Sequence, residues 1–262
     1  MKKQIIQGLW VGRELREIEI MSIKSFLMHG FEYHLYVYDE IQNIPDGTVI
    51  KDANIILDKK NLKLYGKKYA IFSDWFRWEL LYRQGGIWMD MDMICLQAFQ
   101  LEQQKYPLFA REGFKLYATG FLAFEKHHFL TDVMRKACQF PNSFTPYDTL
   151  RYKIKKLVRK IIYKNDITKI PWGESGGPKG FTKAIKYYKL EEHAFEQNLI
   201  YPIHGFDYLD IFTKEIDLMR SKIENAYTLH LFNELINKNK LDMKKITHKH
   251  SLINFLKKRY LS

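Results

Sequence analysis

The sequence has few features that would anchor, divide or crosslink the chain. Its 262 residues contain no apolar run of about eighteen residues, so no segment is predicted to span a bilayer. There is no internal repeat, low-complexity tract or Pro/Gly/Ser-rich linker, which predicts one domain over residues 1–262. The basic start, MKKQIIQGLW, lacks the apolar core of a signal peptide. Cys95 and Cys138 fit no metal-binding spacing and predict buried thiols in a reducing, cytoplasmic compartment.

The chain is strongly basic, with a formal net charge of +12. Hydrophobic residues make up 46% of the sequence, which is enough for a sizeable core. Two basic stretches, 151–164 and 241–262, place apolar residues at helical spacing among lysines and arginines. Such a helix can lie on an anionic membrane, here the inner face of the cell membrane. It can equally pack its apolar stripe on its own domain. Nucleic acid is not an expected partner, because no nucleic-acid-binding module is present.

Strand and helix patterns alternate along the first half of the chain. Period-two or short apolar runs predict strands at 4–11, 33–38, 87–89, 108–110, 118–124, 200–203 and 227–232. Helical spacing predicts helices at 14–29, 71–82, 129–138 and 151–164, with 49–68 as connecting structure. This alternation indicates an α/β fold with a mostly parallel central sheet between layers of helices and helical additions at the carboxyl end.

The stretch YAIFSDWFRWELLYRQGGIWMDMDMI, residues 69–94, organises these patterns. An amphipathic helix ends at Gly85, and an apolar strand follows and leads directly into Asp90 and Asp92. If this strand continues through both aspartates, their side chains share one face and lie roughly 6–7 Å apart. Two carboxylates that close repel each other, so a divalent metal carrying an anionic ligand is expected between them.

A lone D-x-D triplet is a weak signal, because many copies are solvated turns. Here the triplet closes a buried strand, and the carboxyl ends of strands are where open α/β sheets bind ligands. The preceding helix also carries Asp74 and Arg77 on one face. These two residues either face the same site or form a surface ion pair of little energetic value.

The order Ser73-Asp74-x-x-Arg77 followed by Gly85-Gly86-Ile87-Trp88-x-Asp90-x-Asp92 resembles the DXD-containing sugar transferases of glycosyltransferase family 32. The glucosylating domains of clostridial toxins carry a similar core. The resemblance implies a GT-A-like, Rossmann-type fold and retention of anomeric configuration. It also implies a Mn²⁺ or Mg²⁺ ion, a nucleotide-sugar donor (UDP-sugar favoured, GDP-sugar possible), and a glycan or lipid-linked acceptor in capsule or lipopolysaccharide synthesis.

The same resemblance assigns expected roles to individual residues. Asp90 and Asp92 would bind the metal, with Asp90 also near the donor ribose, and His230 is an open candidate for a third ligand. Asp74 and Arg77 would hold the donor sugar and, with the two DXD aspartates, form the catalytic set. The nucleotide would contact residues from three segments: Trp10, Ser73 and Trp88.

Acceptor contacts are expected from Thr119, Glu174 and Gly177. Thr119 lies where family members often carry an asparagine that faces the sugar, and the glycine-rich PWGESGGP segment lies where they shape the acceptor cleft. Residues 1–125 would then form the donor-binding core with the DXD motif. Residues 126–262 would form the acceptor side and the basic helical end.

Two other classes of function remain open at this point. Paired aspartates also serve metal-dependent phosphohydrolases, although those usually need more acidic or histidine ligands than this sequence places together. A basic, non-catalytic protein that binds a membrane or a polyanion would explain the charge without the aspartates.

Overall fold

The computed structural model describes residues 3–65, 68–101, 106–113, 115–240 and 242–262. Its strands are β1 (Ile5–Trp10), β2 (Glu32–Val37), β3 (Thr48–Asp52), β4 (Gly86–Met89), β5 (Met93–Cys95), β6 (Leu108–Arg111), β7 (Tyr117–Phe124), β8 (Ala194–Phe195) and β9 (Thr228–His230). Its helices are α1 (Glu17–Met28), α2 (Lys60–Leu64), α3 (Tyr69–Gln84), α4 (Phe129–Gln139), α5 (Leu150–Ile162), α6 (Pro178–Tyr188), α7 (Gln197–Ile200), α8 (Asp210–Thr213), α9 (Ile216–Ile223), α10 (Asn233–Asn239), α11 (Met243–Ile246) and α12 (Leu252–Tyr260).

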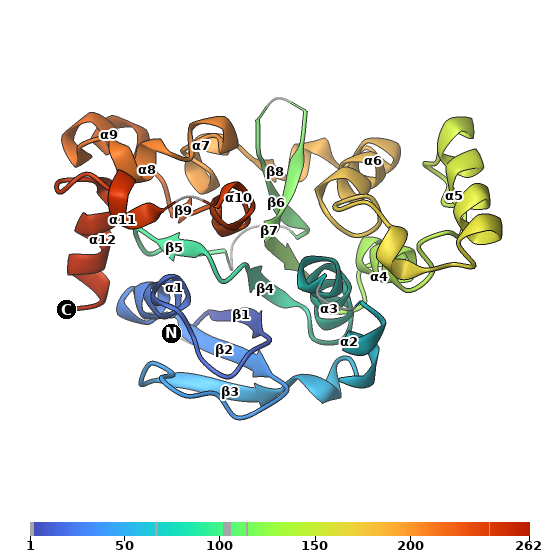
Figure 1. The fold of residues 1–262 in the computed structure, drawn as a ribbon, viewed down its shortest axis with the longest axis horizontal. Coiled ribbons are helices and arrows are strands. Elements are labelled where there is room, and N and C mark those ends of the chain that lie inside the picture. Colours follow the sequence, from blue (N-terminus) through green and yellow to red (C-terminus); the bar gives the residue numbers. More distant parts are fainter. Residues whose placement is uncertain (1–2, 66–67, 102–105, 114, 241) are drawn as a thin grey trace.

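The central sheet has seven strands in the order β3-β2-β1-β4-β7-β6-β8 (Figure 1). Neighbouring strands are parallel except where β7 pairs with β4 and with β6. A second, two-stranded antiparallel sheet joins β5 to β9. The predicted mostly parallel sheet is therefore confirmed, and the chain leaves it between β4 and β5.

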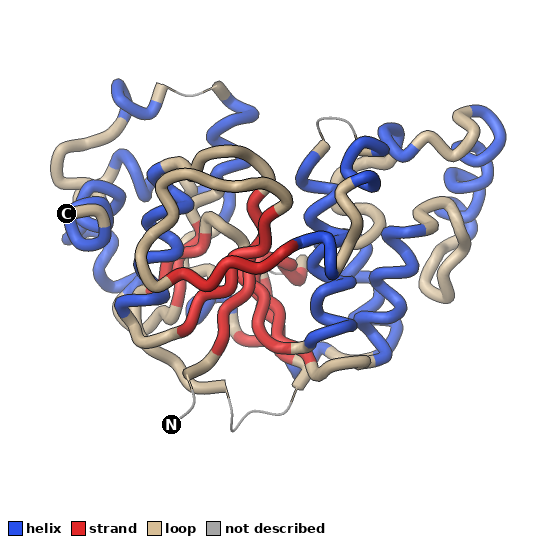
Figure 2. Tube along the Cα trace, turned by 90° about the horizontal axis from the view of Figure 1, so that it is seen from below, coloured by secondary structure: helices blue, strands red, loops and turns tan. Residues whose placement is uncertain are grey.

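Helices cover both faces of the sheet, which makes three layers (Figure 2). Side chains alternate along each strand, so β4 sends Ile87 and Met89 into the cluster under α1 and Trp88 into the cluster under α3. The α1 layer contributes Ile23 and Phe26, and the other layer consists of α3, α4 and α6. Because both faces of β4 are buried, its sequence is apolar without polar alternation.

Most predicted elements are present with shifted ends, and two assignments outside the DXD segment are wrong. The segment 49–68, expected to be connecting structure, contains β3 and α2; its residues 66–67 lie outside the described part of the chain. In the segment 200–203, expected to be a strand, Ile200 is the last residue of the short helix α7 and residues 201–203 follow that helix. Tyr201 and Ile203 are nevertheless buried, so the apolar run reports burial and not strand conformation.

The two basic stretches adopt opposite arrangements. In α12 the apolar residues Leu252, Leu256 and Tyr260 are buried in a cluster with helices α8 to α10, and α12 packs against α1. For this stretch the structure therefore agrees with the alternative that the apolar stripe packs on its own domain. Leu241, at the start of the stretch, lies outside the described residues. In α5 the apolar side chains are exposed instead. Among the described residues, no helix has the length and apolar character needed to cross a membrane.

Candidate functional site

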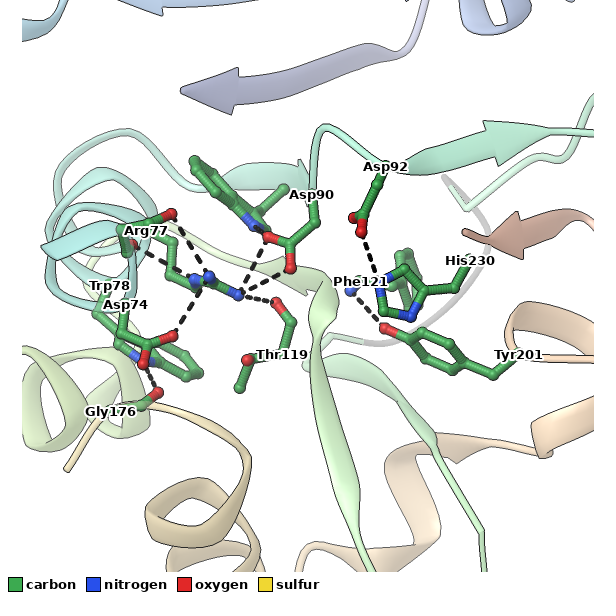
Figure 3. Close-up of polar contacts among 12 residues, drawn as sticks. Asp74, Arg77, Trp78, Asp90, Asp92, Thr119, Phe121, Gly176, Tyr201 and His230 are labelled. Atoms are coloured by element: carbon green, nitrogen blue, oxygen red, sulfur yellow. Dashed lines mark hydrogen bonds and ion pairs between the residues drawn. The ribbon is translucent and has the colours of Figure 1, made fainter. Parts of the chain in front are cut away.

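Asp90 and Asp92 lie in the turn between the central sheet and the two-stranded sheet (Figure 3). β4 ends at Met89, β5 begins at Met93, and the Met93 N–H donates to the Asp90 carbonyl at 3.0 Å. The prediction of one extended strand through both aspartates is therefore wrong. Met89 and Met93 are nevertheless buried in one cluster, and the partly buried Met91 packs against it. The turn allows each carboxylate its own partners.

Asp90 is joined to helix α3 by Arg77. One guanidinium nitrogen, Nη1, lies 3.2 Å from Asp90 Oδ1 and donates to the Thr119 carbonyl at 2.6 Å. The other, Nη2, lies 3.3 Å from Asp74 Oδ1. The Asp74 and Arg77 side chains are only 7% and 6% exposed, so the two form a buried pair and not a surface one. Thr119 contributes its backbone oxygen to this network.

Two further residues hold the same guanidinium and carboxylate. The Trp88 indole N–H donates to Asp90 Oδ1 at 2.8 Å, and the Arg77 guanidinium lies 5.2 Å from the centroid of the Trp88 ring. Arg77 also donates to the Ser73 carbonyl at 3.4 Å and to its hydroxyl at 3.5 Å. The predicted residues Ser73, Asp74, Arg77, Trp88 and Asp90 thus form one connected group.

This group contains two carboxylates and one guanidinium. Burial raises the pKa of Asp74 to about 7, although the charge of Arg77 opposes that shift. Burial would lower the pKa of Arg77, but the attraction of Asp90 and Asp74 outweighs it and the pKa is raised. Arg77 is therefore a permanent cation, and Asp74 is the carboxyl that takes up a proton near neutral pH.

Asp92 is held by the carboxyl-terminal part of the chain. Its Oδ2 accepts the Asn233 N–H at 3.0 Å and lies 3.2 Å from His230 Nε2. The pairing of β5 with β9 brings His230 there, opposite Met93. Burial would raise the pKa of Asp92 and lower that of His230. Their mutual attraction outweighs burial, so the pKa of Asp92 is lowered and that of His230 is raised to about 9.

These residues fit a divalent metal ion that shares a bound ligand. A carboxylate and an imidazole lie side by side, and His230 Nδ1 is buried without a hydrogen-bond partner. The nitrogen that faces Asp92 is Nε2, and it would have to release its proton before it could bind a metal ion beside that carboxylate. Within the described ranges, no three His, Cys, Asp or Glu residues are placed to hold a metal ion. A metal here would therefore complete its shell with ligand oxygens and water, as Mn²⁺ and Mg²⁺ do.

Trp10 lies at the carboxyl end of β1, next to the carboxyl end of β4. This position is where the order of the sheet reverses, since β1 pairs with β2 on one side and with β4 on the other. Trp10 is half-buried; its N–H donates to the Glu14 carbonyl at 3.0 Å, and the Arg16 guanidinium lies 5.4 Å from its ring centroid. Trp10 and Asp90 thus border the same edge of the sheet.

The glycine-rich segment approaches the site from the other side of α3. A Cβ atom on Gly177 would lie 2.7 Å from Asp74 Oδ2 and 2.6 Å from Gly173 Cα, so the backbone can come this close only as glycine. A pocket beside Asp74 is lined by residues of this segment and its neighbours, among them Tyr65, Ile71, Cys138, Gly173, Ser175 and Gly176. Glu174 turns away from this pocket and pairs with Arg159 of α5. Of the acceptor candidates, Thr119 and Gly177 thus contact the Arg77 network.

Three residues near Asp90 and Asp92 had no sequence signal. Gly120 accepts the Asp90 N–H at 2.8 Å, and a Cβ atom on it would lie 2.9 Å from the Tyr201 hydroxyl and 3.2 Å from Asp90 Oδ2. The Tyr201 hydroxyl accepts the Phe121 N–H at 3.0 Å. Burial raises the pKa of Glu112, a shift that the charges of His230 and His204 oppose. These residues come from distant segments, so no local spacing relates them to the aspartates.

Residues 17–109 match the family described as "glycosyltransferase sugar-binding region containing DXD motif". The matched region contains α3, β4 and both aspartates, so the resemblance to DXD sugar transferases is confirmed for this part of the chain. The match supports glycosyltransferase as the class of activity. Metal and nucleotide sugar are what such DXD enzymes generally use.

Solved structures of glycosyltransferases resemble the chain at low identity. The PaToxG glycosyltransferase is 18% identical with a TM-score of 0.48, and the match covers 72% of this chain and 70% of that one. The apo form of glycosyltransferase GlyE from Streptococcus pneumoniae TIGR4 is 14% identical with a TM-score of 0.43, covering 99% of this chain and 64% of GlyE. The ligand-free glycosyltransferase domain of the YGT toxin is 7% identical with a TM-score of 0.43, covering 86% of each chain. No curated protein matched the sequence.

Proposed function

We propose that the chain is a metal-dependent, retaining glycosyltransferase. It transfers a hexose or N-acetylhexosamine from a nucleotide sugar, with UDP-sugar favoured over GDP-sugar. The acceptor is a glycan or a lipid-linked oligosaccharide in the synthesis of a cell-surface polysaccharide such as capsule or lipopolysaccharide. The observation that carries the proposal is the pair of aspartates at the edge of the sheet, Asp90 bound to Arg77 and Asp92 beside His230.

On the donor side, we assign Asp90, Asp92 and His230 to a Mn²⁺ or Mg²⁺ ion. Such an ion, when bound, neutralises the negative charge that develops on the departing nucleoside diphosphate. Trp10 would cover the base, at the sheet edge that it shares with Asp90. Ser73 would contact the nucleotide from α3, where it already touches Arg77. The expected nucleotide contact of Trp88 does not fit its burial in the core, so we assign this ring to orienting Asp90 through its N–H.

The chain's own residues contribute preorganisation. Arg77 holds Asp90 through one nitrogen and Asp74 through another, while the Trp88 N–H orients the Asp90 carboxylate. Because these contacts exist before any ligand binds, little reorganisation is needed when charge develops. Asp74, with a pKa of about 7, can present either a hydroxyl donor or an acceptor oxygen to a donor-sugar hydroxyl.

On the acceptor side, we assign residues 126–262 together with Thr119 from β7. Gly177 brings the segment 171–177 against Asp74, so a sugar held by Asp74 would lie next to this segment. Residues 1–125 supply the remaining donor contacts. His230 is the exception, since it comes from the carboxyl-terminal half and completes the donor side.

The deciding experiment is a donor-hydrolysis screen over UDP- and GDP-sugars, with Mn²⁺, with Mg²⁺ and with a chelator. We expect release of nucleoside diphosphate from at least one donor, only with metal present. The anomeric configuration of the transferred sugar, read by NMR, tests retention. If no donor is cleaved while simple phosphodiesters are, the chain is a phosphohydrolase and the proposal is wrong.

Binding can be measured without catalysis by following thermal stability. A nucleoside diphosphate with Mn²⁺, present at about a hundred times its dissociation constant, should add about 2.7 kcal/mol to the free energy of unfolding. A polyanion such as heparin serves as the comparison. Stabilisation by the polyanion and not by nucleotide with metal would favour the basic, non-catalytic binding protein.

A further inference from the structure

Helix α5 is folded with its polar side inward. Lys156 and Arg159 are buried, whereas six apolar residues of the same helix are between 41% and 75% exposed: Leu150, Ile154, Leu157, Val158, Ile161 and Ile162. This arrangement is the reverse of a surface helix of a globular protein, which buries its apolar stripe. Figure 1 shows α5 at the periphery, at the end of the molecule opposite α12.

Specific polar contacts fix this orientation. Lys156 Nζ lies 2.7 Å from Asp148 Oδ2 and donates to the Ser143 carbonyl at 2.9 Å. Arg159 pairs with Glu174, and both side chains are at most 10% exposed. Turning the apolar stripe inward would break two buried ion pairs and leave their charges unmatched, which is strongly unfavourable. The outward stripe is therefore a property of the fold.

Exposed cations border the stripe on both sides. At 3.6 residues per turn, Arg151 and Lys155 lie along one edge of the stripe, and Lys153 and Lys160 lie along the other. The helix sequence, LRYKIKKLVRKII, contains no acidic residue. The outer face is thus a strip of aliphatic side chains between two rows of positive charge.

The charge decides between possible occupants. A second copy of the chain docked face to face would bring two such sets of cations together without acidic partners, which is repulsive. A bilayer with anionic headgroups matches both features, because its acyl region takes the aliphatic side chains and its headgroups attract the lysines. We infer that the outer face of α5 is a docking surface for an anionic lipid bilayer.

Docking through α5 also orients the rest of the molecule. Arg159 connects α5 to Glu174, and three residues later Gly177 lies against Asp74. The segment 171–177 would therefore lie close to the lipid surface, on the side where a lipid-linked acceptor arrives. This consequence rests on the proposed function; the docking surface itself rests only on the orientation and charge of α5.

The test uses the full chain in a flotation assay with two kinds of vesicle, phosphatidylcholine alone and an equimolar mixture with phosphatidylglycerol. We expect binding to the mixed vesicles at low salt and little binding to phosphatidylcholine. The combined substitution Ile154→Ser, Leu157→Ser and Ile161→Ser should reduce the partition coefficient at least about tenfold. Because these side chains are exposed, the melting temperature should not fall.

Charge is tested with two matched variants that each remove three cations. Lys153→Gln, Lys155→Gln and Lys160→Gln on α5 should reduce partitioning by about fivefold per residue. Lys249→Gln, Lys258→Gln and Arg259→Gln, in and just before α12, should have a much smaller effect because the apolar face of α12 is buried.

Three results would overturn the inference: no binding of the unmodified chain to the mixed vesicles, unchanged binding of the serine variant, or equal losses in the two charge variants. If the first result comes with a dimer that the serine substitutions dissociate, the occupant of this face is a second copy of the chain. Nucleotide-sugar cleavage is measured on the same variants and should stay unchanged. The failure of docking is therefore distinguishable from a failure of the proposed transfer.

Discussion

Asp90 is held from the first half of the chain, and Asp92 from its carboxyl-terminal end. Asp90 meets a guanidinium and an indole N–H, on α3 and β4. Asp92 meets an imidazole and a backbone N–H, at β9 and the start of α10. Two residues in one short turn therefore depend on different parts of the fold.

The two sets of partners differ in whether they leave a group that could bind a metal ion. The charge of Asp90 is matched by Arg77, a permanent cation that is itself buried and bound to Asp74. The partner of Asp92 is a titratable ring with one buried nitrogen that has no hydrogen bond. His230 can release its proton and, with Asp92, would then be able to hold a metal ion, whereas Arg77 keeps its charge beside Asp90. We therefore expect Asp90 to position the turn and Asp92 to contribute most to metal affinity.

Removing the shared cation should have the largest effect. Arg77→Ala leaves Asp74 and Asp90 without a counter-charge, and breaking a buried ion pair in this way costs about 3–5 kcal/mol. Arg83→Ala is the matched control on the same helix, because Arg83 is half-exposed and its pair with Glu79 should contribute at most about 1 kcal/mol. Urea unfolding measures both. Equal losses would show that Arg77 does not hold the Asp90 side together.

Next in size is the substitution Asp92→Asn. The amide can still accept the Asn233 N–H, but it loses the charge that a metal ion needs. We expect release of nucleoside diphosphate to fall by about 10²–10³, a loss typical of removing one preorganised electrostatic contact. Mn²⁺ affinity, measured by calorimetry with UDP present, should fall in parallel. Loss of the pair with His230 should also lower the melting temperature, although less than Arg77→Ala does, because the imidazole can release its proton.

Asp90→Asn completes that test. It should lower the melting temperature more than Asp92→Asn does, because it removes one of the two counter-charges of buried Arg77. Full activity of Asp92→Asn, or a reversed order of the two melting temperatures, would refute the division of roles.

A smaller effect is expected from the indole N–H that orients Asp90. Trp88→Phe removes a hydrogen bond to a carboxylate, and Trp78→Phe removes one of 2.6 Å to the Gly176 carbonyl. Both rings are buried, so the loss of packing is similar. Bonds to charged groups contribute about 1.5–3 kcal/mol and neutral ones about 0.5–1.5, so Trp88→Phe should destabilise by about 1 kcal/mol more. Chemical denaturation decides, and equal losses would contradict the role of Trp88.

The last comparison is a pH dependence that comes from Asp74. Its pKa is about 7 in the folded chain, above the ordinary value of 3.8, so the folded state binds this proton more tightly than the unfolded state. Between these two values stability must fall as pH rises, and Asp74→Asn lacks that contribution. The melting temperature of Asp74→Asn minus that of the unmodified chain should therefore increase from about pH 5 to about pH 7. Parallel curves would show that Asp74 stays ionised.

Local patterns were sufficient to predict the framework of the site. The helical spacing around Asp74 and Arg77 predicted that they share a face, and α3 carries them one turn apart toward the same guanidinium network. The apolar run before Asp90 predicted a buried strand that delivers it to the sheet edge. The same local reasoning failed at residues 90–92, where the chain turns so that β5 can pair with β9. The sequence of the DXD segment does not indicate this pairing, because β9 lies far away along the chain.

The two basic helices show the same limit. Both sequences have an apolar stripe among cations, and sequence alone left packing and membrane contact open for each. α12 buries its stripe against helices that are distant in sequence, whereas buried partners of Lys156 and Arg159 turn the stripe of α5 outward. Asp148 and Glu174 lie outside α5, so the sequence of the helix alone could not predict which of its faces is buried.

By itself, the amino-acid sequence determined most of the strands and helices of the first half of the chain, the position of the aspartates after a buried strand, and the shared face of Asp74 and Arg77. These features depend only on the spacing of apolar and polar residues within one segment, so they can be predicted from that segment alone. Only the tertiary structure decided that Asp90 meets Arg77, that Asp92 meets a backbone N–H 141 positions away, and that α5 faces outward. Contacts at such separations depend on how the whole chain packs, and no local pattern encodes them.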